Sequence, residues 1–355
     1  MTLGVAIALI VIATLLPTNG VTGSTSLWCM VCGPRWLADV ISNVALFVPL
    51  GVALSLVGLR LRRALVVSAS LSITIELLQS VGLPPGRSPA FADWAMNCLG
   101  ALLGALLVTQ RAVLVNPAPR AARRLLAGWT MVALAVLLAS DWALSPATAS
   151  VGATSTVTPS PLPFTPGYGW YAARSDSASV NGVALPHAGT GPIMALAERT
   201  DTVTASVTVS GRDSRDGVVP IVFVHAARDT FAYLLLGQRG NSAIVGTALN
   251  ATRVGLASPD LALPSVFEPE ARARGAPVRL TAIVTHDALS LTAQEAGRDA
   301  QTATLTLSPL LGWTLVQSSV RVGSAFAPFM TGLWMLAWAA PWVFWATRAT
   351  KRRER

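Results

Sequence analysis

Long apolar runs alternate with short polar segments in two parts of the chain. Each run approaches the roughly 20 residues that an α-helix needs to cross a bilayer. The pattern predicts six such helices, at Leu3–Leu16, Val40–Leu59, Ala64–Leu83, Trp94–Thr109, Leu125–Leu144 and Ala325–Thr347. The first run has no basic residue before it and no small-residue cleavage site after it, so we read it as a retained anchor rather than a signal peptide.

A different pattern fills the long interval between the fifth and sixth apolar runs. Residues 145–167 are rich in Pro, Ser and Thr and predict a linker. From 168 to 320, short stretches alternate apolar and polar positions and are separated by turn residues, which is typical of β-strands in a sandwich. The predicted strands are Val203–Val209, Val218–His225, Phe231–Leu236, Ala243–Ala248, Val278–Thr285, Ala288–Thr292, Ala303–Leu307 and Trp313–Val316.

Composition supports a membrane protein. The 355 residues are 52% hydrophobic and only 12% charged, and the mean hydropathy is +0.56. These values exclude a disordered chain and argue against an ordinary soluble enzyme. The fold class we expect is a membrane α-helical bundle of about six transmembrane helices plus an all-β, jelly-roll sandwich outside the cytoplasm.

Three short segments next to the apolar runs carry a charge of +11, and the short segments on the opposite side carry −2, which gives the net charge of +9. The basic residues of the three positive segments are Arg60, Arg62 and Arg63; Arg111, Arg120, Arg123 and Arg124; and Arg348, Lys351, Arg352, Arg353 and Arg355. The positive-inside rule therefore predicts that both termini are cytoplasmic and that residues 145–322 are extracytoplasmic. The same distribution argues against nucleic acid as a partner, because no basic patch with interleaved aromatics is present.

Polar side chains in the helical part gather at one predicted depth, the outer ends of helices two, three and four. They are Arg35, Asp39, Asn43, Glu76, Gln79, Arg87, Asp93 and Asn97. Ionisable groups inside a membrane are costly and commonly face a pocket or a partner, so we interpret this set as a ligand-binding cluster. The structural alternative is that Asp93 caps helix four, Asn97 bridges helices and Arg87 neutralises carboxylates.

Small and kinking residues accompany this cluster. Phe47, Pro49 and Gly51 lie in the middle of helix two, where a proline and a glycine predict a kink. Gly100 and Gly104 form a small-xxx-small face on helix four, which favours close helix packing.

The cysteines predict no metal or cofactor site. Cys29 and Cys32 form a Cys-x-x-Cys that could be a local disulfide or two free thiols, and further metal ligands are not near them in the sequence. No nucleotide, haem or zinc motif is present. We therefore expect no cofactor.

The polar cluster also carries a resemblance. Trp36-Leu-Ala-Asp-Val-Ile-Ser-Asn-Val-Ala-Leu-Phe-Val-Pro-Leu-Gly51, then Ser72-Ile-Thr-Ile-Glu-Leu-Leu-Gln79, Arg87 and Asp93-Trp-Ala-Met-Asn-Cys-Leu-Gly100 resemble the VanZ-like membrane family over about residues 28–108. The resemblance implies a protein of the bacterial cytoplasmic membrane and an association with resistance to glycopeptide antibiotics such as teicoplanin. A large insert and a sixth helix are additions to the four or five helices of a minimal family member.

The insert resembles the concanavalin A-like, laminin-G-type jelly roll through Phe231–Ser242, Thr281–Thr285, Asp287 and Leu289–Thr292. That resemblance implies glycan binding, sometimes with calcium. No calcium-ligand pattern emerges from Asp213, Asp216 and Asp229, and Glu268, Glu270 and Glu295 lack the spacing of a retaining glycosidase of this fold. Candidates for stacking on sugars are Tyr168, Trp170, Tyr171 and Trp313.

The predicted domains are a VanZ-like transmembrane domain (1–144), a linker (145–167), a sandwich (168–320), a transmembrane helix (321–347) and a basic tail (348–355). Three functions fit. The first is a binding protein for membrane lipids, a cell-wall precursor lipid or a glycopeptide, with glycan engaged through 168–320. The second is a membrane enzyme on an isoprenoid-linked or peptidyl substrate, with Glu76 or Asp93 as acid or base. The third is an inert anchor that displays the sandwich. We favour binding over catalysis.

Overall fold

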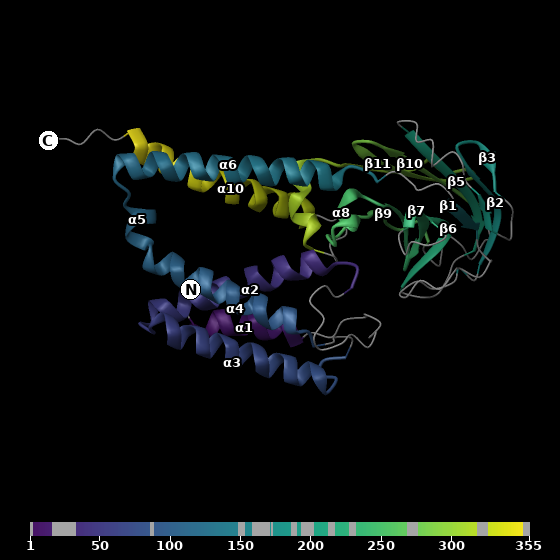
Figure 1. Ribbon diagram of the computed structural model, residues 1–355. Helices are drawn as coiled ribbons and strands as arrows, with labels where there is room; N and C mark the ends of the chain where they lie inside the picture. Colours follow the sequence, from purple (N-terminus) through teal and green to yellow (C-terminus); the bar gives the residue numbers. More distant parts are fainter. Residues whose placement is uncertain are drawn as a thin grey trace. The chain divides into compact units, whose positions relative to one another are not determined.

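The computed structural model (Figure 1) describes most of the helical part and the core of the β-domain. The described residues are 3–15, 33–85, 89–147, 153–157, 171, 173–185, 190–192, 202–211, 217–226, 232–267, 276–317 and 326–350. The chain divides into two compact units, one of residues 1–136 with 335–355 and the other of residues 137–334.

The described residues of the helical part form seven helices: α1 (Leu3–Leu15), α2 (Trp36–Leu56), α3 (Leu61–Ser80), α4 (Phe91–Thr109), α5 (Arg111–Val115), α6 (Pro119–Leu144) and α10 (Phe326–Thr350). Among the described residues, four of them are long and apolar enough to cross a membrane, namely α2, α4, α6 and α10. The membrane prediction is confirmed, but the number six is not. Helix α1 has 13 described residues, and α3 includes two arginines, four serines and a glutamate.

Four helices begin three to six residues before the apolar runs that predicted them: α2, α3, α4 and α6. Their first turns contain polar residues such as Asp39, Arg62 and Asp93. A hydropathy criterion leaves these residues out, although a helix accommodates them well at its ends. Helix α2 is continuous across Pro49, and α10 is continuous across Pro341.

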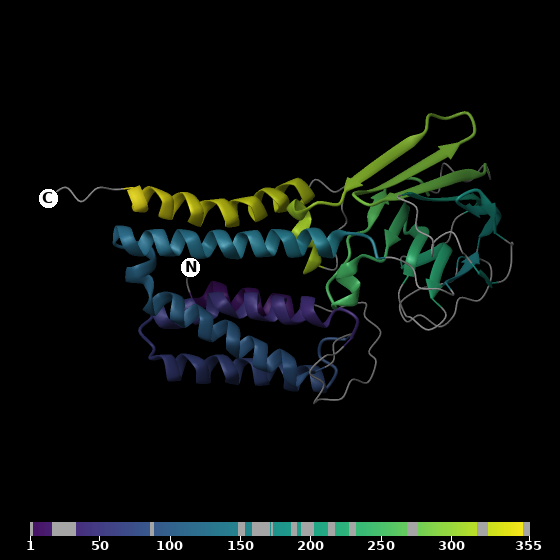
Figure 2. The ribbon, with the colours of Figure 1, turned by 45° about the horizontal axis from the view of Figure 1, so that its top comes forward.

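Helices α1 to α4 lie side by side and form a small bundle (Figures 1 and 2). Its core is one hydrophobic cluster that includes Phe47 and Leu50 of α2, Ile10 of α1 and Ile75 of α3. Phe47 is fully buried. This core orients α2 and α3 so that their polar residues face α4.

The second unit contains a β-sandwich. Its strands are β1 (Ala153–Val157), β2 (Arg174–Val180), β3 (Val183–Ala184), β4 (Thr190–Pro192), β5 (Thr202–Ser210), β6 (Val218–Ala226), β7 (Ala232–Arg239), β8 (Ser242–Thr247), β9 (Leu261–Leu263), β10 (Val278–Thr285), β11 (Ala288–Glu295) and β12 (Gln301–Thr306), with a short helix α8 (Asn250–Arg253). Over the described residues they form two six-stranded antiparallel sheets, β4-β1-β6-β7-β8-β9 and β12-β11-β10-β5-β2-β3 (Figure 2). The predicted sandwich is confirmed.

Strict alternation explains which face of each strand is buried. In β5, Val203, Ala205, Val207 and Val209 are buried between the sheets, and the threonines and serines between them lie on the other face. Strand β10 repeats the pattern. Period-two burial of this kind specifies the strand register, because a slip of one residue would expose the apolar set.

Two segments differ from the sequence-based expectation. Within the predicted linker 145–167, Ala153–Val157 form β1, which pairs with β6 and β4; the run Ala-Thr-Ser-Thr-Val has residues that favour strands. The predicted strand Trp313–Val316 is wrong, because Pro309–Leu315 form a 3-10 helix. Pro309 at the start of that helix has the backbone angle that a helical turn requires.

Candidate functional site

Three glycines let α2 and α4 approach very closely. A Cβ on Gly100 would overlap the carbonyl oxygen of Val44, and a Cβ on Gly104 would overlap that of Val48. A Cβ on Gly51 would overlap the carbonyl oxygen of Ala101 from the other side of the interface. The backbones therefore touch along this seam, as small residues allow in membrane helix pairs.

This close approach brings Asn43 and Asp93 together. Asn43 Nδ2 donates a hydrogen bond of 2.7 Å to Asp93 Oδ1, and the pair links α2 to the first turn of α4. The alternative that Asp93 caps α4 is wrong. The cap residue is Ala90, which makes no side-chain capping bond, and the N–H of Asp93 donates to the Ala90 carbonyl as part of the helix.

Glu76 connects α3 to the start of α4. Its Oε2 accepts a hydrogen bond of 2.8 Å from the backbone N–H of Ala90, the residue at which α4 begins. The carboxylate thus takes the role that an N3 glutamate has in a capping box, although it comes from another helix. One carboxylate of α3 and one of α4 are therefore fixed by hydrogen bonds to a neighbouring helix.

Asn97 and Gln79 are buried within the bundle. Asn97 Nδ2 donates a hydrogen bond of 3.0 Å to Ser72 Oγ. Within the described part of the chain, Asn97 Oδ1 and the nearby Ser68 Oγ have no hydrogen-bond partner. The position of Asn97 agrees with helix bridging, the structural alternative for this residue.

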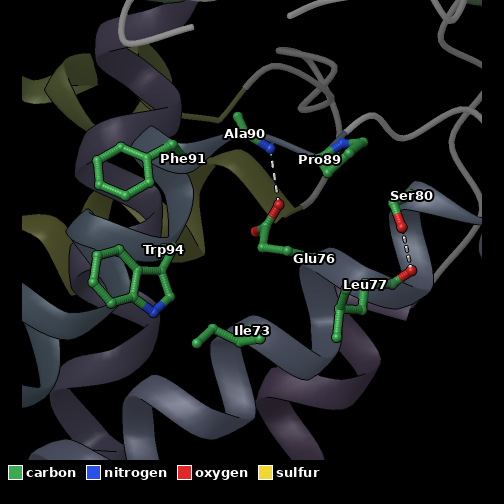
Figure 3. Close-up of a pocket in the computed structure, with 8 residues that line it drawn as sticks. All are labelled: Ile73, Glu76, Leu77, Ser80, Pro89, Ala90, Phe91 and Trp94. Carbon is green, nitrogen blue, oxygen red and sulfur yellow. Dashed lines mark hydrogen bonds between the residues drawn. The ribbon is translucent and has the colours of Figure 1, made fainter. Parts of the chain in front are cut away.

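A pocket of about 420 Å³ lies between α3 and α4 beside Glu76 (Figure 3). Its lining residues are Ile73, Glu76, Leu77, Ser80, Pro89, Ala90, Phe91 and Trp94. Glu76 is the one ionisable side chain among these eight. The rings of Phe91 and Trp94 form one wall, with their centroids 5.3 Å apart. Ile73 and Leu77 are exposed apolar side chains, so in a membrane the pocket would border the lipid.

Sequence reasoning identified Glu76 but missed most of the pocket wall. Phe91 and Trp94 were read only as part of the apolar run or its flank, although an aromatic pair three residues apart lies on one helix face. The predicted residues Arg35 and Asp39 lie at the start of α2 and are exposed. Arg87, Cys29 and Cys32 fall outside the described residues.

The sandwich places several predicted residues differently. Tyr171 and Trp313 are both buried, so they do not offer rings to a sugar. The Tyr171 hydroxyl donates to the Gly211 carbonyl at 3.2 Å. Glu295 forms an ion pair of 3.1 Å with Arg298. Tyr168, Trp170, Asp213, Asp216, Asp229, Glu268 and Glu270 fall outside the described residues. Among the residues that are described, no group of three or more His, Cys, Asp and Glu side chains could hold a metal ion.

The outer face of one sheet carries rows of hydroxyls. The strand registers align Ser179, Ser206, Thr281, Thr292 and Thr302 across five adjacent strands. Neighbours in these rows share hydrogen bonds, at 3.4 Å for Ser206 with Thr281 and 3.0 Å for Thr292 with Thr302. The face is therefore polar and rich in hydroxyls, and Arg279 of β10 adds an exposed charge to it.

The comparisons with known proteins concern the helical part. The family model described as VanZ/LLP1 matches residues 3–114. No curated protein and no solved structure matches the chain. The matched segment contains helices α1 to α4, the Asn43–Asp93 pair and the pocket beside Glu76. The similarity to the VanZ/LLP1 family therefore covers residues 3–114, in a chain that continues with a β-sandwich and a C-terminal apolar helix.

Proposed function

We propose that the VanZ/LLP1 domain binds an amphiphile of the cell envelope, a cell-wall lipid or a glycopeptide. Its apolar chain would lie in the α3–α4 pocket, and its head group would lie among Glu76, Asp93, Asn43 and the flanking Arg35 and Asp39. The observation that carries the proposal is a mostly apolar pocket, bordering the lipid, with a hydrogen-bonded carboxylate at its edge.

The polar contacts would set the affinity. Lipid chains are as apolar as leucine, so moving an acyl or isoprenoid chain from the bilayer into the pocket gains little free energy. Hydrogen bonds to a charged group contribute about 1.5–3 kcal/mol, and more when water is excluded. Selectivity among lipids should therefore depend on Glu76 and its neighbours.

Native mass spectrometry of the purified full chain would test the proposal. Leu77→Trp should fill the pocket and remove the co-purifying amphiphile. Glu76→Gln preserves the acceptor for the Ala90 N–H but removes the charge, so occupancy should fall about tenfold or more.

Two matched variants serve as controls. Val66→Trp adds the same ring to an exposed position of α3 outside the pocket, and Asp141→Asn removes an exposed carboxylate of α6. Both should retain the bound amphiphile. If wild type and all four variants carry the same bulk phospholipids, the pocket is not a binding site.

Catalysis and anchoring are separate outcomes of the same variants. In an enzyme that uses Glu76 as acid or base, Glu76→Gln would abolish product formation rather than weaken binding. In an inert anchor, Glu76→Gln would have no phenotype. If the chain acts in glycopeptide resistance, its deletion should increase teicoplanin susceptibility, and the Glu76→Gln variant should not restore resistance.

We also propose that the chain spans the bacterial cytoplasmic membrane with both termini inside and residues 145–322 outside. The basic segments support this orientation. Arg348 near the end of α10 donates to the Val115 carbonyl at 2.7 Å and to Asn116 Oδ1 at 2.6 Å, so two of these segments lie at one end of the first unit. In intact cells, a membrane-impermeant maleimide should label a cysteine that replaces the exposed Arg298 but not one that replaces the exposed Arg63. Labelling of the cysteine at position 63 alone would mean that the orientation is the reverse.

For the sandwich we propose contact with a neutral polysaccharide through the hydroxyl rows. Hydroxyls that both donate and accept suit the hydroxyl groups of a neutral sugar chain. Thr281 lies at the centre of the row of hydroxyls that runs from Ser179 to Thr302. Thr281→Glu should reduce retention of the full chain on insoluble cell-wall glycan several-fold. Val183→Glu changes an exposed position outside the rows and should not. Equal retention of wild type and Thr281→Glu would remove the proposal.

A further inference from the structure

The polar side chains on the α3 side of the α3–α4 pocket are hydrogen-bond acceptors. Glu76 and Ser80 of α3 supply side-chain oxygens on one side of the pocket, and the aromatic wall opposite includes Trp94, whose Nε1 has no hydrogen-bond partner among the described residues (Figure 3). The Ser80 hydroxyl already donates to the Leu77 carbonyl at 2.7 Å, so its remaining capacity is to accept. An ionised Glu76 only accepts, and since one N–H among the described residues, that of Ala90, donates to it, further lone-pair sites can accept.

The apolar wall adds a second feature that points the same way. Phe91 and Trp94 present an aromatic pair to the pocket opposite Glu76. Aromatic faces attract cations, and the attraction is strongest where water is excluded. A carboxylate in apolar surroundings is also stabilised by a counter-charge.

We propose that the ammonium group of a primary amine lies beside Glu76 at the edge of the pocket, with its attached apolar chain in the pocket. This inference rests on the proposed function and names the head group that the site takes. An ammonium supplies three N–H donors, which match the acceptor oxygens of Glu76 and Ser80. Its positive charge is attracted by the Glu76 carboxylate and by the aromatic rings of Phe91 and Trp94. A phosphate head group would place a second negative charge beside Glu76, and an alcohol would gain no ionic attraction.

The distinction can be tested with amphiphiles of equal chain length. Dodecylammonium, dodecanol and dodecylphosphate are titrated separately onto the full chain in a neutral detergent, and adducts are counted by native mass spectrometry. Dodecylammonium should bind about tenfold more tightly than dodecanol, and dodecylphosphate should bind least. Glu76→Gln should remove this order, whereas Asp141→Asn should leave it unchanged.

Each result has a separate meaning. If the three amphiphiles bind equally and Leu77→Trp prevents binding of all of them, the pocket binds apolar chains but the ammonium inference is wrong. The same conclusion follows if Glu76→Gln keeps the order of wild type. If no amphiphile binds in a manner that depends on Leu77, the proposed function fails as well.

Discussion

Replacing Gly100 by valine should prevent the α2–α4 pair from forming and leave the membrane domain unfolded. Even the first carbon of a side chain at this position would overlap the Val44 carbonyl oxygen. That oxygen belongs to the helix backbone, which cannot rotate away as a side chain can. Overpacking a well-packed site commonly costs 1–3 kcal/mol, and we expect at least about 3 kcal/mol for a backbone clash.

The measurement is the yield and melting temperature of the detergent-purified chain. Gly128→Val is the matched control, because within the described residues no atom beyond the local backbone of α6 lies within 4 Å of the Cβ position at Gly128. Its melting temperature should stay near that of wild type. If Gly100→Val folds with an unchanged melting temperature, then α2 and α4 do not approach each other as described.

Much of this fold follows from periodicity in the sequence. Apolar runs located α2, α4, α6 and α10, and the period-two pattern located β10 with both of its ends. Strands β1 to β4 and β9 were missed because they are short or lie in segments rich in Pro, Gly and Ser. Such strands form through pairing with neighbours such as β6 and β5, and that pairing is not encoded locally.

The candidate site shows the same limit at the level of side chains. The spacing of Asp93 and Asn97 predicted that both lie on one helix face, but it did not identify their partners. Helix packing assigns Asp93 to Asn43 of α2 and Asn97 to Ser72 of α3. The pocket depends on the position of Ala90 relative to Glu76, which the hydrogen bond between them fixes. The sequence before α4 has no hydrophobic periodicity from which that position could be predicted.

Trp313→Ala should destabilise the sandwich unit by about 3–5 kcal/mol, the usual cost of removing a buried aromatic side chain. Trp313 is 5% exposed and lies in the 3-10 helix that follows β12. Its indole N–H donates to Thr331 Oγ1 at 3.1 Å, and a Cβ on the neighbouring Gly312 would overlap the Trp334 ring. The 3-10 helix therefore joins the last strand to the first turns of α10, in which Thr331 and Trp334 lie.

Two further variants separate packing from hydrogen bonding. Thr331→Val removes the acceptor and preserves the shape, so it should cost only about 1 kcal/mol. Trp342→Ala removes a tryptophan that is 49% exposed on α10 and should leave the sandwich unaffected. The stability of all three variants is measured by thermal unfolding, followed through the β-sheet signal in far-UV circular dichroism. A Trp313→Ala effect no larger than that of Trp342→Ala would mean that the 3-10 helix does not hold the sandwich to α10. A Thr331→Val effect equal to that of Trp313→Ala would instead mean that the hydrogen bond, rather than burial of the ring, joins them.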